Sequence, residues 1–408
     1  MSERLSAPVS RAAESIPARH AAAVRPGPRR WFGPGAVVVV VGVLLVLPFY
    51  VTAFWLQTGL FAMAAAIGAI GLNLLSGTTG QLSLGHAFFL AFGAYGYVWL
   101  AGDSGRVGVR HLSGAGLPPL LALVLAVLLT GVVGGLFSPI SGRLRGMYLG
   151  VATLALVFIG HHVMLNAASV TGGFNGRSVP SMGVGDLTLT DGRPDGLEVL
   201  GIPFGRLERL WYFVLILVLV AALTARNLLR GRPGRALGAV RDSEIAAAVM
   251  GVAPARYRSA AFVVSSMYAG LAGALIALIF NRVVPDYFGL ALSIDYLAMI
   301  VIGGLGSVTG AVVGAAFVTM LPQVLSKYAD ALPLVVAPGS PESGVGPGEA
   351  ARYLYGAAIV LVLLFAPGGL VGLLRGRPGG GLGGPGGRGE GLGRLGRTQG
   401  SIRIGSKE

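Results

Sequence analysis

The sequence predicts an all-α, polytopic membrane helix bundle, and three observations support this fold class. Of the 408 residues, 54% are hydrophobic and only 12% are charged, whereas about a quarter of the residues in a soluble domain are charged. Several continuous apolar runs reach about 18 residues or more, which is enough to cross a bilayer as a helix. The runs are continuous rather than alternating polar and apolar, which favours helices over strands as the spanning elements.

The apolar runs predict about 8 full spans plus one glycine-broken helical hairpin, which gives about 8–10 crossings. Pro48 can kink the first span. The full spans are expected at 36–56, 60–75, 87–100, 117–137, 147–167, 211–225, 259–280 and 353–374.

The broken hairpin is predicted at 294–324, a stretch too long for one ordinary span and too short for two full ones. Gly303-Gly304-Leu305-Gly306-Ser307 interrupts it. We expect two half-length helices joined at membrane depth, whose ends offer partial charges and free backbone groups to a polar ligand. A glycine-broken polar turn also lies within 76–95, which hints at two related halves with a site between them.

Residues 76–86 read Ser-Gly-Thr-Thr-Gly-Gln-Leu-Ser-Leu-Gly-His, which is too polar to face lipid. Backbone that breaks a helix at membrane depth must be buried in protein or line a cavity. This segment is therefore either part of a substrate path or an ordinary tight turn near the membrane surface. The first interpretation nominates these path residues: Gly77, Thr78, Gln81, Ser83, His86, Gly303, Gly304 and Ser307.

The basic residues predict the orientation of the chain. The net charge of +14 lies mostly in the tails and in short loops beside spans, a distribution that indicates orientation rather than nucleic-acid binding. With both termini cytoplasmic, 22 of the 31 Lys and Arg residues fall on the inner side and 8 on the outer side, with Arg352 at a boundary. The inner segments are 1–35, 138–146, 226–258 and 375–408. The outer segments are 102–116, 168–209, 281–293 and 327–351.

Three domains follow from this pattern. Residues 1–35 and 375–408 are basic tails, the second rich in glycine and arginine, and both are expected to be disordered in the cytoplasm. Residues 36–374 form the membrane domain, with a cytoplasmic loop at 226–258 and an outer loop at 168–209.

Several chemistries are excluded. The chain has no cysteine, so disulfides, thiolate metal sites and cysteine nucleophiles are impossible. Its two lysines, Lys327 and Lys407, lack the glycine pattern of a P-loop, so the chain cannot hydrolyse ATP by that route. His161 and His162 are adjacent on a predicted helix and point about 100° apart, which makes them a poor metal pair. No metal site is predicted.

The loop at 226–258 contains a predicted helix of about two turns. Asp242 or Ser243 can cap its start, Glu244 suits the first turn, and Gly251 can end it in a left-handed conformation. The helix is expected to expose alanines between two spans. Because so short a helix is marginal alone, it is either a solvated connector or a docking surface for a partner, and we favour docking.

An ordered set of short motifs covers about residues 60–374. The motifs are Gly71-Leu72-Asn73-Leu74-Leu75, Gly80-Gln81-Leu82-Ser83-Leu84-Gly85-His86-Ala87, Gly93-Ala94-Tyr95, Thr171-Gly172-Gly173 with Asn175-Gly176, Gly234-Arg235-Ala236, Arg241-Asp242-Ser243-Glu244-Ile245-Ala246-Ala247, Ala260-Ala261-Phe262, Ile302-Gly303-Gly304-Leu305-Gly306-Ser307 with Gly310, and Pro367-Gly368-Gly369-Leu370. In this order they resemble the LivM-type permeases of branched-chain amino acid ABC transporters. Both tails lie outside the matched region.

The resemblance implies a multi-pass permease subunit, without an ATPase site of its own, in a bacterial cytoplasmic membrane. Its implied partners are a second homologous permease, two cytoplasmic ATPase subunits that bind ATP and Mg²⁺, and an extracytoplasmic substrate-binding protein. This chain itself is expected to bind no cofactor.

In ABC importers the ATPase contacts a cytoplasmic helix with the pattern Glu-Ala-Ala, followed by a glycine four residues after the second alanine. Ile245 stands here at the place of the glutamate, and Glu244 lies one residue earlier. A bulky residue at Gly251, or Glu244→Lys, is expected to uncouple transport without unfolding the spans. The implied coupling residues are Arg241, Asp242, Glu244, Ala246, Ala247 and Gly251.

Three functions compete: an ABC permease, an ion-coupled secondary transporter, and a membrane scaffold. A secondary transporter needs ionisable groups inside the membrane, and the spans contain almost none, with Asp295 near a span end. A scaffold does not need two glycine-broken segments. The ABC permease is therefore favoured, with leucine, isoleucine or valine as substrate and with urea or short amides as the alternative.

Overall fold

The computed structural model describes residues 32–107, 110–144, 146–184, 187–188, 198–199, 202–203, 205–329, 345–365 and 369–374. The predicted tails therefore lie almost entirely outside the described residues. The chain forms two units, one ending at Tyr50 and the other beginning at Val51.

The first unit contains helix α1 (Phe32–Val46) and the 3₁₀ helix η2 (Leu47–Phe49). The predicted single span at 36–56 is wrong, because α1 ends ten residues earlier and the last residues of that range start the next helix. Pro48 explains the end of α1, since proline has no N–H to donate and its ring clashes with the carbonyl one turn earlier.

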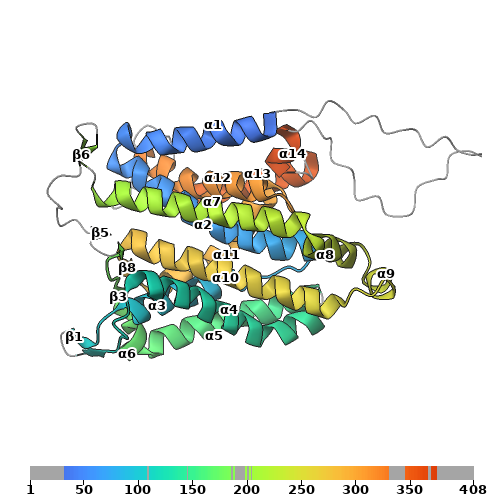
Figure 1. Ribbon diagram of the computed structural model, residues 1–408, viewed down its shortest axis with the longest axis horizontal. Helices are drawn as coiled ribbons and strands as arrows, with labels where there is room; N and C mark the ends of the chain where they lie inside the picture. The colour runs from blue at the N-terminus through green and yellow to red at the C-terminus, as the bar shows by residue number, and fades with distance from the viewer. Residues whose placement is uncertain are drawn as a thin grey trace, which may run out of the picture. The chain divides into compact units, whose positions relative to one another are not determined.

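The second unit holds the remaining elements, and its helices run in the order shown in Figure 1. They are α2 (Ala53–Thr79), α3 (His86–Ala101), α4 (Pro119–Arg143), α5 (Met147–Asn166), α6 (Ala168–Thr171), η3 (Gly173–Asn175), α7 (Arg206–Arg230), α8 (Arg232–Asp242), α9 (Glu244–Val249), α10 (Pro254–Phe280), η4 (Pro285–Phe288), α11 (Leu290–Gly303), α12 (Val308–Lys327), α13 (Pro347–Phe365) and α14 (Gly369–Leu374).

Short strands pair in antiparallel ribbons at the loops of this unit. The pairs are β1 (Gly105–Val107) with β2 (Arg110–Leu112), β3 (Arg177–Ser178) with β8 (Arg282–Val283), β4 (Gly183–Val184) with β5 (Leu187–Thr188), and β6 (Glu198–Val199) with β7 (Ile202–Pro203). The β3–β8 pair joins the predicted outer loop to the end of α10, with Arg177 opposite Val283.

The all-α membrane bundle is confirmed. Within the described residues, six helices are long and apolar enough to cross a membrane, namely α2, α4, α5, α7, α10 and α12. Three shorter apolar helices accompany them, at Gly35–Phe49, α3 and α11. The number of crossings and the side of the termini stay predictions.

Helices α2 and α10 form the centre of the second unit, and α2 also packs against α7, α11 and α12. Small residues allow the closest contacts. A Cβ at Gly273 of α10 would lie 1.8 Å from the carbonyl oxygen of Leu90, so only glycine fits against α3 at this position. The predicted small-residue stripe at 259–280 is therefore a packing surface inside the bundle.

Several helices extend beyond their predicted ends. Helix α4 continues to Arg143, so most of the predicted turn at 138–146 is helical. Helix α12 has 20 residues and is a full-length helix, whereas two half-length helices were expected. The hairpin is longer than the predicted 294–324, because α11 and α12 together occupy 290–327.

Candidate functional site

The loop between α7 and α10 folds into two helices, α8 and α9, which lie at the end of the bundle opposite β3 and β8 (Figure 1). The predicted short helix is confirmed as α9. The Ser243 hydroxyl caps it by accepting a hydrogen bond from the Ala246 N–H at 3.3 Å. Gly251 has φ +83°, the left-handed conformation expected at a helix end.

Helix α9 exposes large apolar side chains. Ile245 is 81% exposed, Val249 84% and the following Met250 69%. Ala246 and Ala248 are also exposed, as expected for α9, but Ala247 is fully buried, which the sequence did not predict. Ala247 faces inward because it lies on the side of α9 that packs toward the bundle.

Glu244 faces the bundle as well. Its carboxylate forms an ion pair with Arg258 near the start of α10, and the two side chains are 20% and 12% exposed. The pair links α9 to α10, and its two charges are partly removed from water. The structure thus gives Glu244 an anchoring contact inside the chain, whereas Asp242 is exposed.

Arg241, near the end of α8, contacts the C-terminal end of α2. Its Nη1 donates a hydrogen bond of 2.6 Å to the carbonyl oxygen of Gly77. The last carbonyls of a helix have no partner within the helix and carry partial negative charge, which suits a guanidinium. Arg241 therefore ties the predicted coupling segment to a residue of the predicted substrate path.

Asn73 of α2 holds the turn between α11 and α12. Its Oδ1 accepts from the Gly306 N–H at 2.8 Å, and its Nδ2 donates to the carbonyl oxygen of Ser307 at 2.9 Å. The Ser307 hydroxyl then caps α12 by accepting from the Gly310 N–H at 3.1 Å. Sequence reasoning did not nominate Asn73, although one amide in an otherwise apolar run was a usable signal.

The glycine-broken segment at 80–85 leaves α2 and returns as α3. The hydroxyls of Thr78 and Thr79 bond to carbonyls four residues earlier, so α2 continues through them and the break begins only at Gly80. Gln81 and Ser141 of α4 exchange two hydrogen bonds, of 2.9 and 3.3 Å. The segment is thus fixed to another helix of the bundle.

The start of α3 is buried against α11. The Ser293 hydroxyl accepts a hydrogen bond of 3.0 Å from the Ala87 N–H, so α11 supplies the cap that α3 lacks in its own sequence. The rings of His86 and Tyr296 lie 4.8 Å apart, and both residues are almost completely buried. Helix α3 therefore begins inside the bundle.

The structure brings the two predicted glycine-broken segments together. A Cβ at Gly77 would lie 2.5 Å from the backbone nitrogen of Gly306, so the end of α2 touches the α11–α12 turn directly. Of the nominated path residues, Ser307 is half-buried and these are buried: Gly77, Thr78, Gln81, Ser83, His86, Gly303 and Gly304. Their role in transport stays a prediction.

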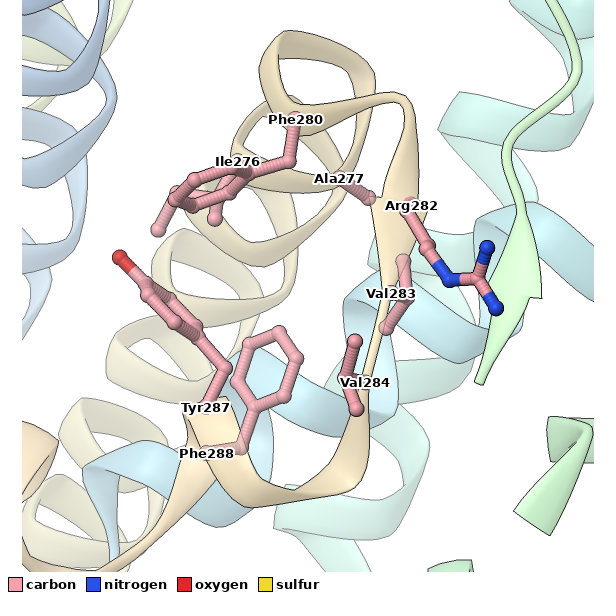
Figure 2. Close-up of a pocket in the computed structure, with 8 residues that line it drawn as sticks. All are labelled: Ile276, Ala277, Phe280, Arg282, Val283, Val284, Tyr287 and Phe288. Atoms are coloured by element: carbon pink, nitrogen blue, oxygen red, sulfur yellow. The ribbon is translucent and has the colours of Figure 1, made fainter. Parts of the chain in front are cut away.

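A separate cavity of about 180 Å³ lies at the other end of α10 (Figure 2). It is lined by Ile276, Ala277, Phe280, Arg282, Val283, Val284, Tyr287 and Phe288, none of which was nominated from the sequence. The Arg282 guanidinium bonds the Asn175 carbonyl oxygen at 2.6 and 3.2 Å. With an almost wholly apolar lining, this cavity lacks groups that could bind both charges of an amino acid.

Three ionisable side chains outside α8 and α9, namely His161, His162 and Asp295, form local contacts. His161 contacts Asp286 at 3.2 Å, while His162 lies 3.2 Å from Asn166, so the adjacent histidines have different partners. Asp295 accepts a hydrogen bond of 2.7 Å from the Tyr355 hydroxyl. Within the described part of the chain, no three metal-ligating side chains gather.

Comparison with known proteins identifies the family. The model of the family described as "Branched-chain amino acid transport system / permease component" matches residues 55–363. The chain is 29% identical over 337 residues to the high-affinity branched-chain amino acid transport system permease protein LivM of Salmonella typhimurium and to that of Escherichia coli, covering 80% of this chain and 72% of each relative.

A probable LivM protein of Methanocaldococcus jannaschii is 25% identical over 259 residues, covering 62% of this chain and 68% of that protein. No solved structure gives a significant match. Because the family model spans most of the chain, including α2 through most of α13, this protein belongs to the permease family of branched-chain amino acid transport systems.

Proposed function

We propose that this chain is a permease subunit of an ABC importer that moves leucine, isoleucine or valine across the bacterial cytoplasmic membrane. A second permease completes the channel, two cytoplasmic subunits bind ATP and Mg²⁺, and an extracytoplasmic binding protein delivers the substrate. The chain belongs to a family of transport permeases rather than enzymes. It contributes the gate, and its partners hydrolyse the nucleotide.

One observation carries the proposal: the exposed apolar face of α9. Ile245, Val249 and Met250 extend from a capped, ion-paired helix at the end of the bundle where the spans stop. Exposed large apolar side chains on a small rigid element are typical of a protein interface. The ATPase subunits are the proposed occupants, and their closure pushes α9 so that the permease alternates between inward- and outward-facing states.

The substrate path runs between the two glycine-broken segments. Gly77 and the α11–α12 turn touch at the end of α2, and the path uses the nominated residues of both segments.

Reconstituted transport tests the proposal. The chain, its partner permease and the ATPase subunits are placed in proteoliposomes with the binding protein on the opposite side. Radiolabelled leucine is expected to accumulate only with ATP and Mg²⁺, and to keep accumulating when ionophores collapse the ion gradients. Uptake that needs an ion gradient and not ATP would instead indicate a secondary transporter. Competition with valine, urea and acetamide, and the ligand retained by the binding protein, identify the substrate class.

A further inference from the structure

We infer that Arg241 is the positioning residue through which the α8–α9 segment holds the α11–α12 turn, so that movement of α9 reaches the glycine-broken hairpin. The inference rests on the proposed function, because it assumes that an ATPase moves α9. It concerns a contact inside this chain, distinct from the exposed face of α9 on which the partner is proposed to dock.

The first part of the link joins α8 to α2. Gly77 is among the last residues of α2, so its carbonyl has no partner within the helix. The N–H that would continue the helical pattern, that of Gln81, bonds instead to the Thr79 hydroxyl at 3.3 Å. Arg241 Nη1, a charged donor, donates a hydrogen bond of 2.6 Å to this free Gly77 carbonyl oxygen. Charge-assisted hydrogen bonds of this kind are stronger than neutral ones.

The second part joins the end of α2 to the α11–α12 turn without intervening side chains. A Cβ at Gly306 would lie 3.5 Å from the Gly77 carbonyl oxygen and 3.9 Å from Arg241 Nη1. The guanidinium, the end of α2 and the turn therefore meet at one place. Gly306 has φ +79°, a conformation that favours glycine and allows this close approach.

Asn73 provides the third part. It lies one helical turn before Gly77, on the same face of α2, and binds both Gly306 and Ser307 of the turn. The turn is thus fastened to α2, and the end of α2 is fastened to α8. Only Ser243 separates α8 from α9. Because Arg241 lies so close to α9 in the chain, a displacement of α9 moves Arg241 as well.

The Glu244–Arg258 ion pair runs in a different direction, to α10. Besides its buried apolar residues, the coupling segment therefore has two polar anchors, one on each of the two central helices. Only the Arg241 anchor lies against the broken hairpin, which is why we assign the transmission of movement to it.

The test uses the assembled complex in proteoliposomes and compares Arg241→Gln with Arg241→Lys. Arg235→Gln is the matched control, because Arg235 is exposed on the same helix, as Arg241 is, but bonds only the nearby Arg230 carbonyl oxygen, at 3.4 Å. ATP hydrolysis and leucine uptake are measured in the same vesicles. Arg241→Gln is expected to keep ATP hydrolysis within about twofold but to lower uptake per ATP about tenfold, the usual worth of a charged hydrogen bond in an equilibrium. Arg241→Lys restores part of the loss, and Arg235→Gln changes neither quantity.

A second measurement follows the turn itself. The chain has no cysteine, so Leu305→Cys places one thiol on the α11–α12 turn, where Leu305 is 51% exposed. A non-hydrolysable ATP analogue is expected to change the rate of maleimide labelling in the Leu305→Cys complex, and the added Arg241→Gln substitution is expected to abolish that change.

Three results decide the matter. If Arg241→Gln keeps normal uptake per ATP and nucleotide-dependent labelling, the inference is overturned. If uptake and ATP hydrolysis fall together and the melting temperature drops, Arg241 has a structural role only, which also overturns it. If the unsubstituted complex shows no ATP-dependent uptake, the proposed function fails, and this inference fails with it.

Discussion

Asn73 is a single side chain that binds two backbone groups 233 and 234 positions away in the sequence. Asn73→Ala leaves the Gly306 N–H and the Ser307 carbonyl without this partner. Since the turn is partly exposed and water replaces some of the loss, we expect the free energy of unfolding to fall by about 1–3 kcal/mol. The measurement is thermal unfolding of the purified protein in detergent.

Asn166 is the matched control for Asn73. Its side chain bonds to the His162 carbonyl within its own helix, at an exposed position. Asn166→Ala is therefore expected to change stability by less than about 0.5 kcal/mol. Equal shifts for the two variants would show that Asn73 does not hold the turn.

The Glu244–Arg258 pair revises an expectation from the sequence. Glu244→Lys was expected to uncouple transport without unfolding, but it places a second cation beside Arg258 in a partly buried site. We now expect it to loosen α9 and to lower the melting temperature, with a cost of about 1–3 kcal/mol after allowance for partial exposure. The double variant Glu244→Arg with Arg258→Glu restores opposite charges and should recover much of the stability. No recovery would mean that the pair contributes little.

At the scale of the element, α9 carries the prediction about docking. Val249→Asp puts a charge into the exposed apolar face, where burial of one such side chain is worth about 1.5–3 kcal/mol. The affinity of the Val249→Asp permease for the ATPase subunits should fall at least about tenfold, as measured by co-purification or by binding of the isolated ATPase. Val249→Ile keeps the apolar face and serves as control. Unchanged binding of Val249→Asp would remove α9 from the interface.

Helices α8 and α9 and the α11–α12 turn show which parts of the site could be predicted from the sequence. Helix α9, with its Ser243 cap and its left-handed Gly251, and the break at 303–307 were predictable, because caps and glycine turns are local signals. Helix α8 was not predicted, because its glycines and arginines indicate a loop. It forms because Pro233 suits a first turn and because Leu237 and Val240 are buried on one face.

The contacts between helices within the site could not be predicted from local sequence patterns. Arg241 was named for a docking role, and no spacing in the sequence indicates that its guanidinium meets the carbonyl of Gly77, 164 positions away. Ser293 likewise caps α3 across 206 positions. Such pairs depend on how helices pack, and a single sequence carries that information only as an unexplained polar residue in an apolar run.

At the scale of the whole second unit, the contacts divide along α10. Helix α9 lies beside the start of α10, which Glu244 contacts through Arg258, and the apolar cavity lies where α10 ends. The 27 residues of α10 span about 40 Å, enough to cross a bilayer. We therefore expect the α9 face and the cavity to face opposite sides of the membrane.

The excess of basic residues predicts which side that is, and cysteine labelling can test it. The chain has no cysteine, so Val249→Cys on α9 and Phe174→Cys on η3 each introduce one thiol, at positions 84% and 69% exposed. A membrane-impermeant maleimide applied to intact cells or spheroplasts is expected to label Phe174→Cys and to reach Val249→Cys only after permeabilisation. Leu305→Cys, on the turn that Arg241 approaches, should behave like Val249→Cys. Labelling of Val249→Cys in intact cells would place α9 outside, where no cytoplasmic ATPase could push it, and the transport mechanism proposed here would fail.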